Sequence, residues 1–226
     1  MNLLLYFSPG ACSRVPLIAL EEAGVPFEAR VVAFMAGEHR KPDYLALNPA
    51  GKVPTLVADG EAVAQNVAIL TFLARSLPAA RLLPFAGEPL GDARILSQLA
   101  WFSADLHPLV TRIRIPTFAC DTDPARVKAL ASTAMAAQLQ PLEQRLAGQP
   151  WVLGDDWSLL DAYLHWVWFR VTGAGFDAAP FPNLAAHHAR MAERPAVQRA
   201  LDRERQAEAE LEARGLAVKL PPAGAR

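Results

Sequence analysis

The sequence predicts a small mixed α/β domain followed by an all-helical domain. Residues 1–78 alternate strand-like and helix-like segments, which is typical of an α/β unit. Residues 79–90 are rich in Ala, Gly and Pro and are expected to form an interdomain linker. From residue 91 to residue 214 only helical periodicity remains, and residues 215–226 are a predicted tail. These three observations define the predicted fold class and its boundaries.

The first domain is expected to have the element order β-α-β-α-β-β-α. Strands are predicted at residues 3–7, 27–34, 53–58 and 62–64, and helices at 15–23, 43–48 and 67–77. Asp59-Gly60 lies between the last two strands, and this dipeptide favours a tight hairpin turn. The second helix should end before Pro49, because a residue that precedes proline avoids helical backbone angles.

The second domain is expected to consist of helices with recognisable ends. These helices are predicted at residues 92–110, 124–148, 159–171, 184–194 and 195–214. Pro108 should kink or break the first of them. Ser158 and Asp161 form a predicted capping box at the start of the third, which is apolar nearly all round and is therefore expected in the core. Asn183 is the predicted cap of the fourth, and the fifth is expected to be a solvated helix of alternating charge.

Composition and charge exclude several classes of protein. The chain has 226 residues, a net charge of −1 and 52% apolar residues, so it has no general attraction for nucleic acid or an anionic membrane. No apolar run has the length of a membrane span, and the amino terminus lacks the basic segment of a signal peptide. Two distant cysteines, Cys12 and Cys120, suit a reducing compartment. We therefore expect a soluble cytoplasmic protein.

No metal site is expected. The neighbours His187 and His188 do not share a helix face, and His39 and His165 have no partner at ligand spacing.

The segment from Phe7 to Arg14 places Cys12 between a strand and the start of a helix. The free N–H groups and the positive dipole at a helix start favour a thiolate over a thiol. Pro16 suits this interpretation, because proline in the first helical turn loses no hydrogen bond. Cys12 is therefore a candidate for a reactive or thiol-contacting group. The alternative is a small buried residue, since cysteine is buried often.

Six short motifs along the chain resemble those of the glutathione transferases, and within them the bacterial beta class. They are YFSPGACS at 6–13, LNPAGKVP at 47–54, QNVAI at 65–69, DLH at 105–107, SLLDAYL at 158–164 and MAERPAV at 191–197. Their order and spacing match the family over almost the whole chain. The resemblance implies a thioredoxin-like first domain, an all-helical second domain and a homodimeric detoxification enzyme.

The resemblance also implies roles for individual residues. The Val53-Pro54 bond would be cis, with the Val53 backbone pairing with the cysteinyl part of glutathione; otherwise Pro54 is an ordinary strand-edge proline. Gln65 and Asn66 would bind the γ-glutamyl carboxylate at a helix start, or form a plain cap. Asn66 departs from the serine that is usual in the family.

His107 matches the beta-class histidine that approaches the glutathione sulfur together with the loop cysteine, here Cys12. An imidazole beside a thiol can donate a hydrogen bond to the thiolate or accept its proton. The alternative is a histidine that is merely satisfied within the core. Pro108 replaces a basic residue that is common in beta-class members. Candidate substitutes for the missing charge are Arg40, Lys41, Lys52, Arg112 and Arg114.

The predicted activity is transfer of glutathione, as a co-substrate, to a small electrophile, or reduction of that electrophile. Two mechanisms stay open: the glutathione thiolate attacks with Cys12 as a neighbour, or Cys12 forms a mixed disulfide with glutathione. Val15 stands where a Cys-x-x-Cys pair would need its second cysteine, so the sequence does not favour disulfide exchange. Other candidates are a glutathione-dependent isomerase, a thiol-disulfide oxidoreductase and a non-catalytic regulator with the same fold.

Overall fold

A four-stranded mixed sheet organises the amino-terminal part of the chain. Its strands are β1 (Leu3–Phe7), β2 (Glu28–Val31), β3 (Thr55–Ala58) and β4 (Glu61–Ala64), in the spatial order β2-β1-β3-β4. β1 pairs in parallel with β2 and antiparallel with β3, and Leu5 faces Ala29 on one side and Leu56 on the other. The computed structural model describes residues 1–217.

The β3–β4 hairpin confirms the turn that the sequence predicts. Asp59 and Gly60 both have positive φ angles, of 48° and 92°, as a two-residue hairpin turn with matching twist requires.

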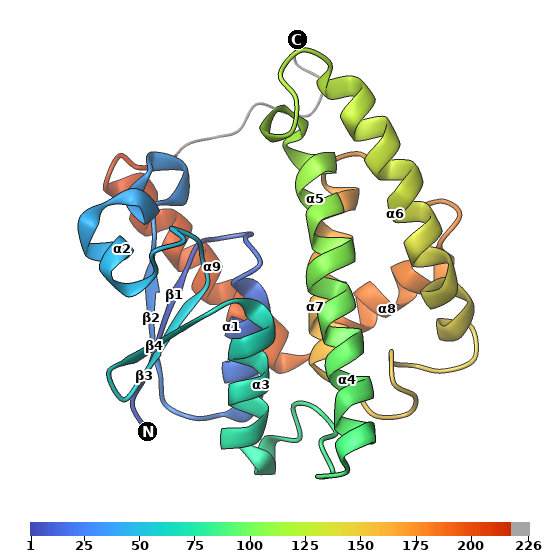
Figure 1. The fold of residues 1–226 in the computed structure, drawn as a ribbon, viewed down its shortest axis with the longest axis horizontal. Helices are drawn as coiled ribbons and strands as arrows, with labels where there is room; N and C mark the ends of the chain where they lie inside the picture. Colours follow the sequence, from blue (N-terminus) through green and yellow to red (C-terminus); the bar gives the residue numbers. More distant parts are fainter. Residues whose placement is uncertain (218–226) are drawn as a thin grey trace. The chain divides into compact units, whose positions relative to one another are not determined.

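Helices cover both sides of this sheet (Figure 1). They are α1 (Arg14–Ala23), α2 (Pro42–Leu47) and α3 (Asn66–Ser76), with short 3₁₀ turns η1 (Phe34–Ala36), η2 (Glu38–Arg40) and η3 (Pro78–Ala80). α1 and α3 pack together, and both contribute fully buried side chains, among them Leu17, Ile18, Ile69 and Leu70. This is the predicted βαβαββα order. β2 is shorter than predicted, because the chain turns into η1 at Phe34.

The last helix, α9 (Pro195–Ala213), belongs to the same compact unit as the sheet. The sequence pattern places residues 195–214 with the helical domain as a solvated helix, whereas α9 buries one face against α1. Small residues on that face, Ala196 and Ala200, allow close approach, and Arg14 forms a buried ion pair with Glu204. The predicted tail at 215–226 lies outside the described residues from 218 on.

The second unit, residues 83–193, is helical. It contains α4 (Pro89–Trp101), a π-helical turn η4 (Phe102–Leu106), α5 (His107–Arg114), a 3₁₀ turn η5 (Pro116–Phe118), α6 (Pro124–Leu146), α7 (Leu159–Thr172) and α8 (Pro182–Ala192). α7 contacts α5 and α8 and is buried over most of its length, as predicted for a core helix. No helix within residues 1–217 is long and apolar enough to cross a bilayer.

Pro108 interrupts the predicted helix at 92–110 without ending it. The backbone widens to a π-helical turn in η4, and the His107 N–H bonds to the Phe102 carbonyl, five residues back. A π turn is one way in which a helix accommodates proline, which has no N–H and crowds the preceding turn. His107 therefore stands at the junction between η4 and α5.

Two helix starts show how capping works in this unit. Ser158 and Asp161 form the predicted capping box at α7. The cap of α8 differs from the prediction, since Asn183 lies inside the helix and Phe181 is the N-cap residue. The free N–H groups of Asn183 and Leu184 instead donate to the Glu143 carboxylate of α6, at 2.9 Å each. A distant side chain supplies this cap, so no local pattern indicates it.

Candidate functional site

A tight loop after β1 carries Cys12 to the start of α1. Ser13 is fully buried, and its hydroxyl oxygen accepts from the Ser8 N–H and donates to the Ser8 carbonyl, both at 3.1 Å. These bonds close the loop, and they leave the Ser13 side chain no capping bond to α1. Cys12 thus lies one residue before the helix N-cap, on a loop that these hydrogen bonds close.

The Cys12 thiol is a hydrogen-bond donor. Its Sγ lies 3.4 Å from the backbone carbonyl oxygen of Val53 and donates to it. Burial raises the pKa of Cys12 to about 12, and the opposing effects of backbone N–H groups and of the Lys52 charge are smaller. Desolvation of this half-buried side chain therefore outweighs the helix start, and it favours the neutral thiol over the thiolate expected from the sequence.

The segment before β3 presents Val53 to the thiol. The Val53-Pro54 peptide bond is cis, as the resemblance implies. The Tyr44 hydroxyl donates to the Lys52 carbonyl at 2.8 Å and lies 2.9 Å from the Thr55 hydroxyl. Tyr44 therefore ties α2 to both ends of the segment that contains Val53.

Asn48 strengthens the same attachment. Its Nδ2 group donates to the Lys52 carbonyl at 2.7 Å and to the Thr55 hydroxyl at 3.0 Å. Tyr44 and Thr55 are buried positioning residues that the sequence analysis missed. Their side chains contact the site segment only in the fold, so neither spacing nor composition marks them.

Gly51 makes the turn into this segment possible. Its φ angle is +56°, and an added Cβ would lie 3.1 Å from the His39 carbonyl oxygen. A side chain at this position would be strained both by the backbone conformation and by the close carbonyl. Glycine is therefore required here for a local structural reason.

Gln65 and Asn66 lie at the start of α3, as predicted, but they face different surroundings. Gln65 is the exposed N-cap residue and has a positive φ angle of 74°. Asn66 is buried, and its Nδ2 group donates to the Cys12 carbonyl at 3.2 Å. The buried Oδ1 atom of Asn66 has no hydrogen-bond partner among residues 1–217. Asn66 thus links the Cys12 loop to α3, while its Oδ1 atom accepts no hydrogen bond from residues 1–217.

His107 belongs to the helical unit and is held by aromatic side chains. Its Nδ1 atom lies 2.9 Å from the hydroxyl of Tyr163, and its ring packs edge-on against Trp166 at a centroid distance of 4.6 Å. Tyr163 is fully buried and Trp166 nearly so. The imidazole of this half-buried residue is therefore oriented from α7, which the sequence did not predict.

The candidate cations differ in their exposure. Arg40, Lys41, Lys52 and Arg112 are exposed, whereas Arg114 is half-buried. The Lys52 charge acts on Cys12, since it lowers the pKa of the thiol against the larger effect of burial. Among the five candidate cations, Lys52 is therefore the one whose charge affects a predicted site residue, Cys12.

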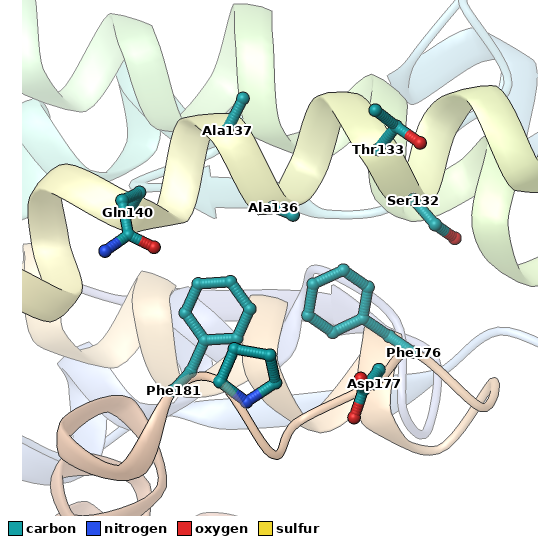
Figure 2. Close-up of a pocket in the computed structure, with 9 residues that line it drawn as sticks. Ser132, Thr133, Ala136, Ala137, Gln140, Phe176, Asp177 and Phe181 are labelled. Atoms are coloured by element: carbon teal, nitrogen blue, oxygen red, sulfur yellow. The ribbon is translucent and has the colours of Figure 1, made fainter.

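An open cavity of about 540 Å³ lies within the helical unit, between α6 and the segment that precedes α8 (Figure 2). Phe176 and Phe181 form one wall, and small α6 side chains such as Ala136 form the other (Figure 2). None of the predicted site residues lines this cavity, so it is not the predicted glutathione site.

In the first unit, the arrangement brings together a neutral thiol, a backbone carbonyl and a helix start. Cys12 contacts Val53 and, through its own carbonyl, Asn66. A peptide-like ligand can pair with an extended backbone segment, and a helix start can bind a carboxylate. The first unit therefore offers the two kinds of contact that a small acidic peptide requires.

Comparison with known proteins gives the family. Residues 9–76 match the family model for the glutathione S-transferase N-terminal domain, and residues 97–195 match the model for its C-terminal domain. A sphingomonad glutathione S-transferase solved with glutathione is 36% identical, with a TM-score of 0.78, over 89% of this chain and 98% of that one. The beta-class enzyme of Sphingomonas chungbukensis is 35% identical, with a TM-score of 0.79 and the same coverage.

A relative named for a different reaction also matches. Maleylacetoacetate isomerase of Pseudomonas aeruginosa is 34% identical over 168 residues, which are 73% of this chain and 78% of that protein. Both family models and the sphingomonad structure confirm the family resemblance that the motifs indicate. The chain therefore belongs to the glutathione S-transferase family.

Proposed function

We propose that this glutathione transferase joins the sulfur of glutathione to a small electrophile, with Cys12 as a neighbouring hydrogen-bond donor and not as the nucleophile. The observation that carries the proposal is the Cys12 thiol on the Val53 carbonyl, 3.4 Å away. A thiol with a pKa of about 12 is almost entirely protonated at neutral pH. Because the thiolate is the attacking form, this pKa favours the sulfur of glutathione as the nucleophile.

Glutathione would lie along the segment before β3 and reach the start of α3. The Val53 backbone would pair with its cysteinyl part, next to cis-Pro54. The first N–H groups of α3, beside Gln65 and Asn66, would receive the γ-glutamyl carboxylate. The tripeptide sulfur would then be close enough to Cys12 to accept a hydrogen bond from its thiol.

The reaction needs one proton to leave and one bond to form. The glutathione thiol loses its proton to His107 or to water, and the sulfur attacks the electrophilic carbon. In a substitution, the leaving group departs with the electron pair of its bond. Tyr163 would hold the His107 imidazole in position through the 2.9 Å contact with Nδ1. Replacement of His107 by Gln should therefore change the dependence of kcat/KM on pH.

The experiment compares conjugation of 1-chloro-2,4-dinitrobenzene by the wild type, Cys12→Ala and Cys120→Ala. Transfer should fall only a few-fold in Cys12→Ala, and the Cys120→Ala control should match the wild type. Loss of all transfer in Cys12→Ala, with glutathione binding intact, would contradict the proposal. Mass spectrometry after incubation with oxidised glutathione tests the competing mechanism, because a rapid mixed disulfide on Cys12 would favour thiol-disulfide exchange.

An isomerase is the second candidate, and the similarity to maleylacetoacetate isomerase favours it. In such a reaction the sulfur of glutathione adds to a carbon–carbon double bond, which becomes a single bond and can rotate. The C–S bond then breaks as the double bond re-forms in the trans geometry, so glutathione is not consumed. Product formation from a cis-unsaturated acid with constant glutathione would support the isomerase.

We also propose a cytoplasmic homodimer with a role in detoxification, as the resemblance to the beta class implies. Light scattering on the purified protein tests the dimer, and a monomer at micromolar concentration would contradict it.

A further inference from the structure

Arg114 is a half-buried cation without a counterion in the described part of the chain. It is the last residue of α5, and its Nε atom is buried without a hydrogen-bond partner among residues 1–217. No carboxylate within these residues forms an ion pair with it, and burial lowers the pKa of its guanidinium group. Removing a charged group from water without a partner costs free energy.

The position of Arg114 at a helix end does not explain this cost. A cation in the last turn of a helix interacts favourably with the carbonyl end of the dipole. Arg112 is in the same last turn and is exposed, so it supplies this interaction without desolvation. The half-buried guanidinium group of Arg114, with one buried donor unpaired among residues 1–217, is therefore available to an anionic ligand.

The helix places Arg114 on the same face as His107. The two residues are seven apart, which is close to two turns and a rise of about 10 Å. Side chains on a helix lean toward its amino terminus, which favours an arginine side chain that extends along α5 toward His107. Thr111 lies between them on this face and is exposed.

We propose that Arg114 binds the carboxylate of an anionic electrophile whose reacting carbon lies toward His107. The planar guanidinium group can hold a carboxylate through two parallel hydrogen bonds, which fixes orientation as well as charge. A ring or a short unsaturated chain between the carboxylate and the reacting carbon would span the distance along α5 between Arg114 and His107. This inference rests on the proposed function and names its substrate class.

The test uses two electrophiles that differ only in charge, 4-chloro-3,5-dinitrobenzoate and 4-chloro-3,5-dinitrobenzamide. The wild type should have a kcat/KM for the acid about tenfold to a hundredfold above that for the amide, after correction for their uncatalysed rates. Arg114→Gln should bring this ratio close to one, and Arg114→Lys should retain part of it. Arg112→Gln is the matched control and should keep the ratio of the wild type. High salt should lower the preference.

Binding measurements distinguish a failure of the inference about Arg114 from a failure of the proposed function. Calorimetry with glutathione and with the two premade glutathione conjugates tests the ligand site directly, whether or not turnover is fast. Equal affinity of the wild type for both conjugates would overturn the inference about Arg114 and leave the proposed function intact. An equal loss for both conjugates in Arg114→Gln would also overturn it. Absence of binding by glutathione and by both conjugates would overturn the proposed function and this inference together.

Discussion

The Cys12 thiol donates a hydrogen bond to the carbonyl oxygen of Val53, with Sγ and oxygen 3.4 Å apart. The contact joins the loop after β1 to the segment before β3, which are 41 residues apart in the sequence. It stabilises the protonated form of Cys12, and burial acts in the same direction on its pKa. Cys12 is therefore positioned to donate a hydrogen bond to a second sulfur instead of attacking by itself.

The two cysteines should differ in their reaction with iodoacetamide. With a pKa of about 12, the thiolate fraction of Cys12 at pH 8 is about one in 10⁴. Hydrogen bonding to the Thr122 hydroxyl lowers the pKa of Cys120. Without glutathione, Cys120 should be alkylated first, and the rate at Cys12 should rise about tenfold for each pH unit from 8 to 11. Peptide mass spectrometry measures both rates, and alkylation of Cys12 at or above the rate of Cys120 at pH 8 would contradict the neutral thiol.

Asn66→Ala should weaken glutathione binding by loosening the Cys12 loop. The substitution removes the 3.2 Å bond from Nδ2 to the Cys12 carbonyl, which is worth about 1 kcal/mol. We expect the KM for glutathione to rise about fivefold to tenfold, with a smaller change in kcat. Asn2→Ala, at an exposed position on the same unit, is the control. An unchanged KM in Asn66→Ala would remove Asn66 from the site.

Tyr44→Phe should disturb the segment that carries Val53. The lost hydroxyl leaves the buried Thr55 hydroxyl and the Lys52 carbonyl each with one partner fewer, at a cost of about 1–2 kcal/mol. Urea unfolding should show this loss, and steady-state kinetics should show a higher KM for glutathione. Tyr6→Phe is a matched control, because within residues 1–217 the Tyr6 hydroxyl accepts a hydrogen bond only from the exposed Arg30. Equal effects of the two substitutions would show that the Tyr44 hydroxyl has no special role.

Glu204→Gln should destabilise the first unit strongly. Arg14, two residues after Cys12, and Glu204 of α9 form an ion pair with both side chains 5% exposed. Removing one charge of a buried pair leaves the other uncompensated and costs about 3 kcal/mol or more. Glu208→Gln changes an exposed glutamate on the same helix and should cost less than about 0.5 kcal/mol. Chemical denaturation measures both, and a loss below 1 kcal/mol in Glu204→Gln would mean that water replaces the missing charge.

Local patterns predicted most elements of this fold. Three predicted features depend only on residues that are close in the sequence, and the structure has all of them. They are the alternating strands, the Asp59-Gly60 turn and the Ser158–Asp161 capping box. The motifs assigned Cys12 and Val53 to one predicted glutathione site, and the structure adds the direct contact between these two residues.

Features that depend on distant residues were missed or wrongly predicted. The protonation of Cys12 follows from burial, which only the assembled fold determines. The attachment of α9 to α1 depends on a pair 190 residues apart in sequence, Arg14 and Glu204. The cap of α8 comes from Glu143 on another helix, and Tyr44 reaches the site segment from α2. None of these contacts has a local sequence pattern.

Calorimetric titration of the reduced protein with glutathione at neutral pH, in the wild type and in Cys12→Ala, tests the central claim most directly. We predict saturable binding in both proteins, with affinities that differ by no more than about tenfold, because Cys12 contributes one hydrogen bond to the ligand. No binding to the folded wild type at millimolar glutathione would contradict the claim and favour a non-catalytic role. Binding that disappears entirely in Cys12→Ala would make Cys12 the main attachment point for glutathione and contradict its role as a neighbour.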